Sequence, residues 1–78
     1  MEMDSRESLE MLTDAHRRAE KLVRGLLEQQ ADLAAHPPHL PPDKLAQGQL
    51  AMANAVAAAR RALQNLDDAL RIASTSSN

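Results

Sequence analysis

The sequence predicts an all-α protein: an antiparallel, coiled-coil-like hairpin of two helices, completed by a partner or by self-association. Two long stretches place apolar residues at alternating spacings of three and four, the pattern of one helix face. A proline-dense segment, HPPHLPP at 36–42, separates them. The period-two alternation of half-buried strands is missing, and alanine, glutamate and arginine favour helices. We therefore expect no β structure.

The first helix is expected from about residue 5 to residue 35. Asp4 is followed three residues later by Glu7, which resembles a capping box at a helix start. At the other end, proline disfavours the helical conformation of the residue before it, so the helix should end near Ala35 or His36.

The second helix is expected from about residue 42 to residue 73, with a frayed polar tail, STSSN, at 74–78. Pro42 suits a first turn, where its missing N–H has no helical partner, and Asp43 suits the positive end of the helix dipole. Each helix would hold about 30 residues and span about 45 Å. Because the loop at 36–42 is short, the helices should be antiparallel neighbours within one domain, residues 1–78.

The first helix presents one broad apolar stripe. Its arc is about 160° wide, whereas a helix that docks on one neighbour needs only about 100°. The centre of the stripe consists of Leu9, Leu12, His16, Ala19, Val23, Leu26, Gln30 and Leu33. Its two edges are widened by Met11, Ala15 and Leu22 on one side and by Leu27 and Ala34 on the other.

The second helix carries two apolar stripes, about 90° apart around its axis. The leucine stripe consists of Leu45, Met52, Val56, Ala59, Leu63, Leu66 and Leu70. The alanine stripe consists of Ala51, Ala55, Ala58, Ala62, Ala69 and Ala73. The leucine stripe can fill the space between the helices, and the alanine stripe allows a further backbone to approach closely. Alternatively, alanine occupies those positions only because it is the best helix former.

The composition indicates that the hairpin needs a partner. The 78 residues include no Cys, Trp, Tyr or Phe, so disulfides are excluded and the core is thin. A core of this size rarely contributes more than about 3–5 kcal/mol. The net charge of −2 gives no general attraction to nucleic acid or anionic membranes. No apolar run approaches the roughly 20 residues of a membrane span, and MEMDSRES lacks the regions of a signal peptide, so we expect a soluble, cytoplasmic protein.

No group of residues predicts chemistry. Zinc needs three or four ligands, whereas His36 and His39 lie in the loop and His16 lies in the first apolar stripe. Gly25 and Gly48 are isolated within helices and form no phosphate-binding loop. PPHLPP has the PxxP spacing of a polyproline ligand, but it also enforces the helix reversal. We expect no enzyme activity, cofactor or metal.

A basic segment, HRRAEKLVR at 16–24, admits two interpretations. It can bind phosphates or an acidic partner, or it can be a solvated face with helical ion pairs. The second interpretation follows from spacing, because Asp14 precedes Arg18 by four residues and Glu20 precedes Arg24 by four. The chain lacks the aromatic side chains that stack on bases, so we do not expect nucleic-acid binding.

Two segments resemble the small E-type co-chaperones of bacterial type III secretion needle subunits. They are SLEMLTDAHRRAEKLVRGLLEQQADL at 8–33 and LPPDKLAQGQLAMANAVAAARRALQNL at 40–66. The likeness covers about residues 8–70 and consists of length, hairpin layout, an acidic residue near the second helix start and an Ala/Leu-rich second helix. It implies a non-catalytic cytoplasmic protein that binds a larger helical-repeat chaperone. Through that chaperone it helps to keep the needle subunit unpolymerised before export.

The residues predicted to bind the partner lie mainly on the alanine stripe. They are Ala51, Ala55, Ala58, Ala62, Ala69, Leu22 and Leu66. Two alternatives stay open: a homodimeric four-helix bundle that serves as an adaptor or regulator, and a hairpin that binds structured RNA through its basic segment.

Overall fold

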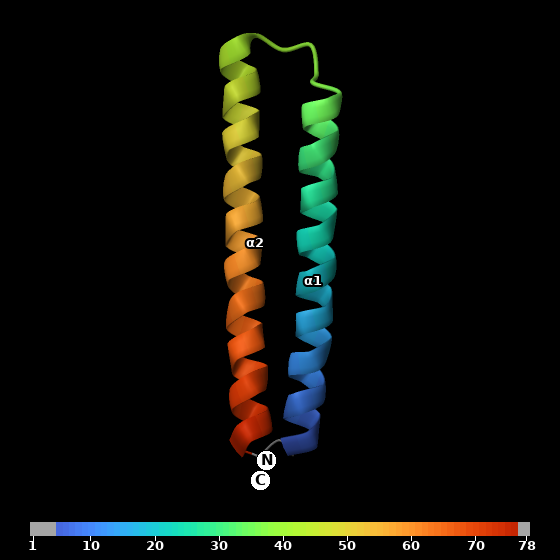
Figure 1. The fold of residues 1–78 in the computed structure, drawn as a ribbon, viewed down its shortest axis with the longest axis vertical. Helices are drawn as coiled ribbons and strands as arrows, with labels where there is room; N and C mark the ends of the chain where they lie inside the picture. Colours follow the sequence, from blue (N-terminus) through green and yellow to red (C-terminus); the bar gives the residue numbers. More distant parts are fainter. Residues whose placement is uncertain (1–4, 77–78) are drawn as a thin grey trace.

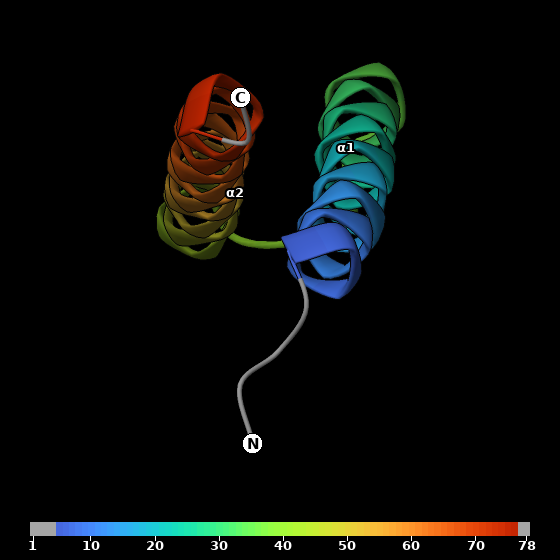
Figure 2. The same cartoon turned by 90° about the horizontal axis from the view of Figure 1, so that it is seen from below.

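The computed structural model describes residues 5–76, which form two antiparallel helices joined by a short loop (Figure 1). Helix α1 spans Ser5–Ala35 and helix α2 spans Pro42–Ser76. Viewed along their axes, the helices lie side by side in a single layer (Figure 2). The described part contains no strand, so the predicted all-α hairpin is confirmed.

The prolines bound both helices where the sequence predicts. The last turn of α1 closes with the His36 N–H, which donates to the Asp32 carbonyl at 2.8 Å. α2 begins at Pro42, and its first turn includes a bond of 3.0 Å from the Leu45 N–H to the Pro41 carbonyl. The helix reversal is therefore confined to residues 36–41, and each proline lies where a backbone N–H is not needed.

The outer ends of the helices differ from the prediction. α2 continues to Ser76, so the frayed tail expected from residue 74 is wrong for residues 74–76. The segment contains no proline or glycine to end the helix, and the Thr75 hydroxyl donates to the Arg71 carbonyl one turn earlier, at 2.8 Å. Residues 77 and 78 lie outside the described residues, as does Asp4 of the expected capping box.

The core lies where the stripe of α1 meets the leucine stripe of α2. Val23, Val56 and Ala59 are the most enclosed of the described residues, with exposed fractions of 8%, 6% and 7%. The other members of the leucine stripe and of the centre of the α1 stripe are half-buried, and no described side chain is exposed by less than 2%. The stripes therefore face each other as predicted, but the two helices alone do not enclose them.

The dimensions of the hairpin also show that two helices do not enclose the core. The chain exposes 6306 Å² of surface, whereas a compact protein of its mass would expose about 4,700 Å². Its radius of gyration is 17.5 Å, against about 11.5 Å for a compact chain of this length. Its Cα extents are 56 × 23 × 15 Å, so it is one helix thick in its shortest direction. Both flanks of the core are open to a neighbour.

Replacing Leu63 with alanine should unfold the hairpin more easily. Leu63 lies half-buried on the leucine stripe, and its loss should lower the free energy of unfolding by about 2 kcal/mol. The matched control is Leu50→Ala, because Leu50 is 63% exposed. This substitution should lower the free energy of unfolding by no more than about 0.5 kcal/mol. Urea unfolding followed by far-UV circular dichroism measures both. Equal losses would contradict the placement of the core.

Candidate protein-binding surface

One face of the hairpin is polar and is marked by His16. The His16 Nδ1 lies 3.0 Å from the Glu20 carboxylate on the same helix, and the Nε2 lies 3.2 Å from the Asp67 carboxylate on α2. The contact with Asp67 joins the two helices at this level. A shallow depression on this face is lined by His16, Glu20, Arg60, Leu63, Gln64 and Asp67.

The opposite face is apolar. On α1, Leu22 lies about 160° around the helix from Glu20, on the other side of the core stripe. On α2, the alanine stripe likewise lies on the other side of the leucine stripe from Asp67. Because Glu20 and Asp67 share the polar face, Leu22 and the alanine stripe share the face behind it. We call this surface the alanine face: Met11, Ala15 and Leu22 on α1, with the alanine stripe on α2.

Large apolar side chains are exposed on the alanine face. Leu22 is 57% exposed and Met11 is 59% exposed. Of the predicted binding residues on α2, four are exposed and two are half-buried. The exposed ones are Ala51, Ala55, Ala58 and Ala62; the half-buried ones are Ala69 and Leu66. Leu66 lies on the leucine stripe, at the edge that borders the alanine stripe, so it belongs to the core as well as to this face.

A shallow, open groove lies over Gly25 on the surface of α1, on the outer flank of the alanine face. It is lined by Arg18, Lys21, Leu22, Gly25, Leu26 and Gln29. A Cβ atom added at Gly25 would meet no atom within 4 Å, so packing within the hairpin does not require glycine there. This groove was not predicted from the sequence, although a glycine in mid-helix, three residues after Leu22, is a signal for it.

Basic side chains form a belt around the middle of the hairpin. Because Asp67 contacts His16 and the helices are antiparallel, Leu22 lies level with Arg61. At this level the two helices carry six basic side chains and one carboxylate, in a chain of net charge −2. We call this group the basic belt: Arg17, Arg18, Lys21 and Arg24 on α1, and Arg60 and Arg61 on α2.

One of the two expected ion pairs on α1 is present. Arg18 lies 3.0 Å from the Asp14 carboxylate, as the spacing predicts. The expected pair between Glu20 and Arg24 is wrong, because Glu20 contacts His16 instead. His16 is held at that position by its second contact, with Asp67 on α2. Arg24 consequently forms no salt bridge within residues 5–76.

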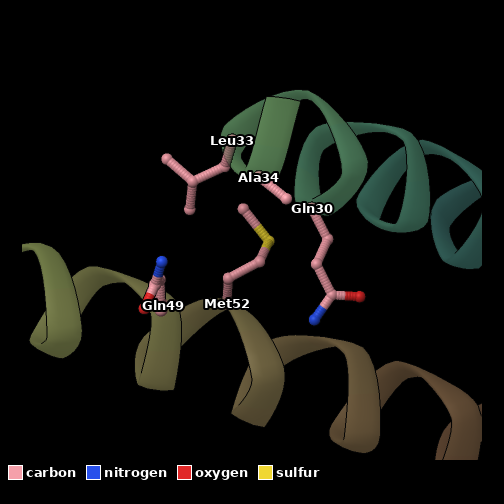
Figure 3. A pocket seen from close by; sticks show the side chains of 5 residues that line it. All are labelled: Gln30, Leu33, Ala34, Gln49 and Met52. Carbon is pink, nitrogen blue, oxygen red and sulfur yellow. The ribbon is translucent and has the colours of Figure 1, made fainter. Parts of the chain in front are cut away.

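A second depression lies between the helices near the loop, with a volume of about 230 Å³. Figure 3 shows the Met52 side chain of α2 reaching toward Leu33 and Ala34 of α1, with two amide side chains beside it. The lining residues are Gln30, Leu33, Ala34, Gln49 and Met52. None of them is an acid, a base or a nucleophile, so this depression offers shape without reactive chemistry.

The other sequence candidates lie apart from these surfaces. His36 and His39 are exposed on the loop, and His16 is half-buried. Within residues 5–76, no group of three or more His, Cys, Asp or Glu residues is placed to hold a metal ion. Neither described helix combines the length and apolar character needed to cross a membrane.

No protein-family model, curated protein or solved structure matches the chain. The resemblance to needle co-chaperones therefore stays a prediction from the sequence.

Proposed function

We propose that this chain is a non-catalytic cytoplasmic co-chaperone that binds and stabilises a larger helical-repeat chaperone. The observation that supports this proposal is the alanine face, an apolar surface shared by both helices and left uncovered by the hairpin. A continuous exposed apolar surface on a small protein is typical of a site for another macromolecule. The helical repeats of the proposed partner supply helices of the kind that can cover it.

The area of the hairpin supports the same proposal. Its exposed surface exceeds that of a compact protein of its mass by about 1,600 Å². A standard protein interface buries about 800 Å² on each partner, so one such interface fits within this excess. A partner that binds only the folded hairpin stabilises it by mass action. A partner that covers the open face would therefore also compensate for the thin core.

The alanine stripe suits a close helix–helix contact. Ala51, Ala55, Ala58 and Ala62 follow one another at spacings of four, three and four, and so form a ridge of methyl groups. Such a ridge permits an interaxial distance near the short end of the usual 8–10 Å. Leu22 lies beside this ridge and supplies a larger side chain for a pocket on the partner.

The proposed role in type III secretion rests on the sequence resemblance to needle co-chaperones. An amphipathic needle subunit would polymerise if its apolar face were exposed, so a complex that covers this face keeps the subunit soluble before export. In this proposal the present chain supports the larger chaperone and acts on the needle subunit through it. The hairpin needs no catalytic group for that role.

A homodimeric four-helix bundle is the second candidate, because the alanine face could also pack against its symmetry mate. The complex would then contain two copies of this chain and no helical-repeat chaperone. Co-expression with a helical-repeat chaperone encoded nearby, followed by mass determination of the purified complex, separates the two candidates.

Ala58→Leu should weaken the complex with the chaperone while leaving the hairpin folded. A leucine on the methyl ridge forces the partner helix outward, which should cost about 1–3 kcal/mol, or roughly a five- to hundredfold loss of affinity. The matched control is Ala57→Leu, because Ala57 is also exposed but lies about 140° around α2 from the stripe. Titration calorimetry measures affinity, and circular dichroism checks the fold. Equal affinity of the two variants would show that the alanine stripe only favours the helix.

The isolated chain should be marginally stable or should self-associate. Its apolar stripes extend beyond what two helices enclose, and any self-association makes the melting temperature rise with protein concentration. Thermal melts over a wide concentration range, together with sedimentation equilibrium, measure both properties. A monomer of high stability at every concentration would contradict the incomplete core.

A further inference from the structure

We propose that the partner covers the alanine face with an acidic amphipathic helix. An apolar side chain of that helix enters the groove over Gly25, and its carboxylates pair with Arg18 and Lys21 on one side and Arg61 on the other. This inference rests on the proposed function, in that the alanine face is taken as the surface that binds. It adds the chemistry of the segment that binds there and its position along the hairpin.

The groove over Gly25 is the first observation. Glycine in a helix interior is destabilising relative to alanine, because it loses more backbone conformational entropy on folding. Apart from its chain neighbours and the adjacent backbone of α1, nothing in the hairpin lies within 4 Å of the place where its Cβ would be, so no packing contact offsets this cost. Leu22 and Leu26 supply the apolar part of its lining, and Arg18, Lys21 and Gln29 supply the polar part. An apolar side chain from outside fits this space.

The charges that flank the groove are the second observation. Arg18 and Lys21 line the groove itself on α1. Arg61 lies level with Leu22 and on the far side of the alanine stripe on α2. A helix lying between them along the alanine face would have cations on both of its flanks. Glutamate or aspartate at its flanking positions would meet these cations, as charged flanking residues do in coiled coils.

These cations are available for a partner. Within residues 5–76, neither Lys21 nor Arg61 forms a salt bridge. Arg18 pairs with Asp14, but its side chain is 81% exposed, and an exposed pair of this kind is easily exchanged. Carboxylates on a docked helix would therefore form new salt bridges with Lys21 and Arg61, and would displace only the Asp14 carboxylate from Arg18.

The same charges disfavour a second copy of this chain as the occupant. The basic belt lies near the middle of the hairpin. Any two-fold dimer that overlaps along the whole face would therefore bring the belt of one copy level with the belt of the other. Like charges in an interface oppose association. An acidic helix meets no such repulsion.

Nucleic acid also fits less well than an acidic helix. Phosphates would use the cations but not the apolar side chains beside them, and the chain has no Phe, Trp or Tyr to stack on bases. The combination of an apolar centre and cationic flanks matches an amphipathic helix with acidic flanks.

Two designed peptides test the inference on the full chain. Both are helices of about 20 residues, roughly 30 Å long, with the same leucine stripe. One carries glutamate and the other lysine at every charged position. The acidic peptide should bind at least about tenfold more tightly at low salt, and the difference should shrink as salt rises. Equal binding, or tighter binding of the lysine peptide, would overturn the inference.

Charge-reversal variants locate the contact. The double variant Arg18→Glu and Lys21→Glu should lose the preference for the acidic peptide. The matched control, Arg17→Glu with Arg24→Glu, makes the same change in net charge away from the groove and should keep the preference. If both double variants lose it equally, the effect is one of net charge and the proposed site is wrong.

Substitution of Gly25 tests the groove. Gly25→Leu should strengthen the helix and weaken binding of the acidic peptide about tenfold or more, because the leucine fills the space. Gly48→Leu is the matched control, since Gly48 is also helical with open space at its Cβ but lies near the loop. Unchanged binding by Gly25→Leu would overturn the inference. So would preference for poly-uridine RNA over the acidic peptide, or a homodimer that excludes the peptide.

The outcomes also separate this inference from the proposed function. If Ala58→Leu abolishes binding of the helical-repeat chaperone while the peptides show no charge preference, the chaperone proposal holds and the acidic-helix inference is wrong. If the acidic peptide binds as described but the chaperone does not bind at all, the chaperone proposal is wrong and the face takes its acidic helix from another protein.

Discussion

The structure depends on one constraint: two helices in a single layer cannot enclose the apolar residues they carry. Each helix buries one stripe against the other, and only Val23, Val56 and Ala59 become buried among the described residues. The chain contains no aromatic side chain that could cover more of the core from within one layer. The stability of the hairpin and the identity of its partner are therefore linked, because a helix that completes the core also raises the stability of the fold.

The two faces of the hairpin meet this constraint in different ways. On the polar face, the His16 ring lies between the carboxylates of Glu20 and Asp67, so its polar atoms already have partners within the chain. On the alanine face, the exposed groups are methyl groups and the side chains of Leu22 and Met11, which have no polar partner to seek. Water contacts the first face at little cost, whereas covering the second removes apolar area from water. This asymmetry supports the assignment of one binding face.

The sequence predicted the features that depend on neighbours along the chain. The helix break follows from proline geometry at 36–42, and the two core stripes follow from helical spacing. Features that depend on the other helix were missed. Glu20 pairs with His16 and not with Arg24 because Asp67, far away in sequence, holds the ring. The basic belt also needs the antiparallel register, which brings Arg61 level with Leu22.

The alanine stripe and the basic belt have different roles in recognition. A ridge of identical methyl groups fits a neighbouring helix almost equally well after a shift of one turn, so it contributes contact area but little positional information. Charges at one level and the groove over Gly25 do distinguish these positions, as polar positions set the register of coiled coils. Exposed charges contribute more to association rate and specificity than to affinity. A partner with acidic flanks would thus take its affinity from the alanine face and its register from the belt and the groove.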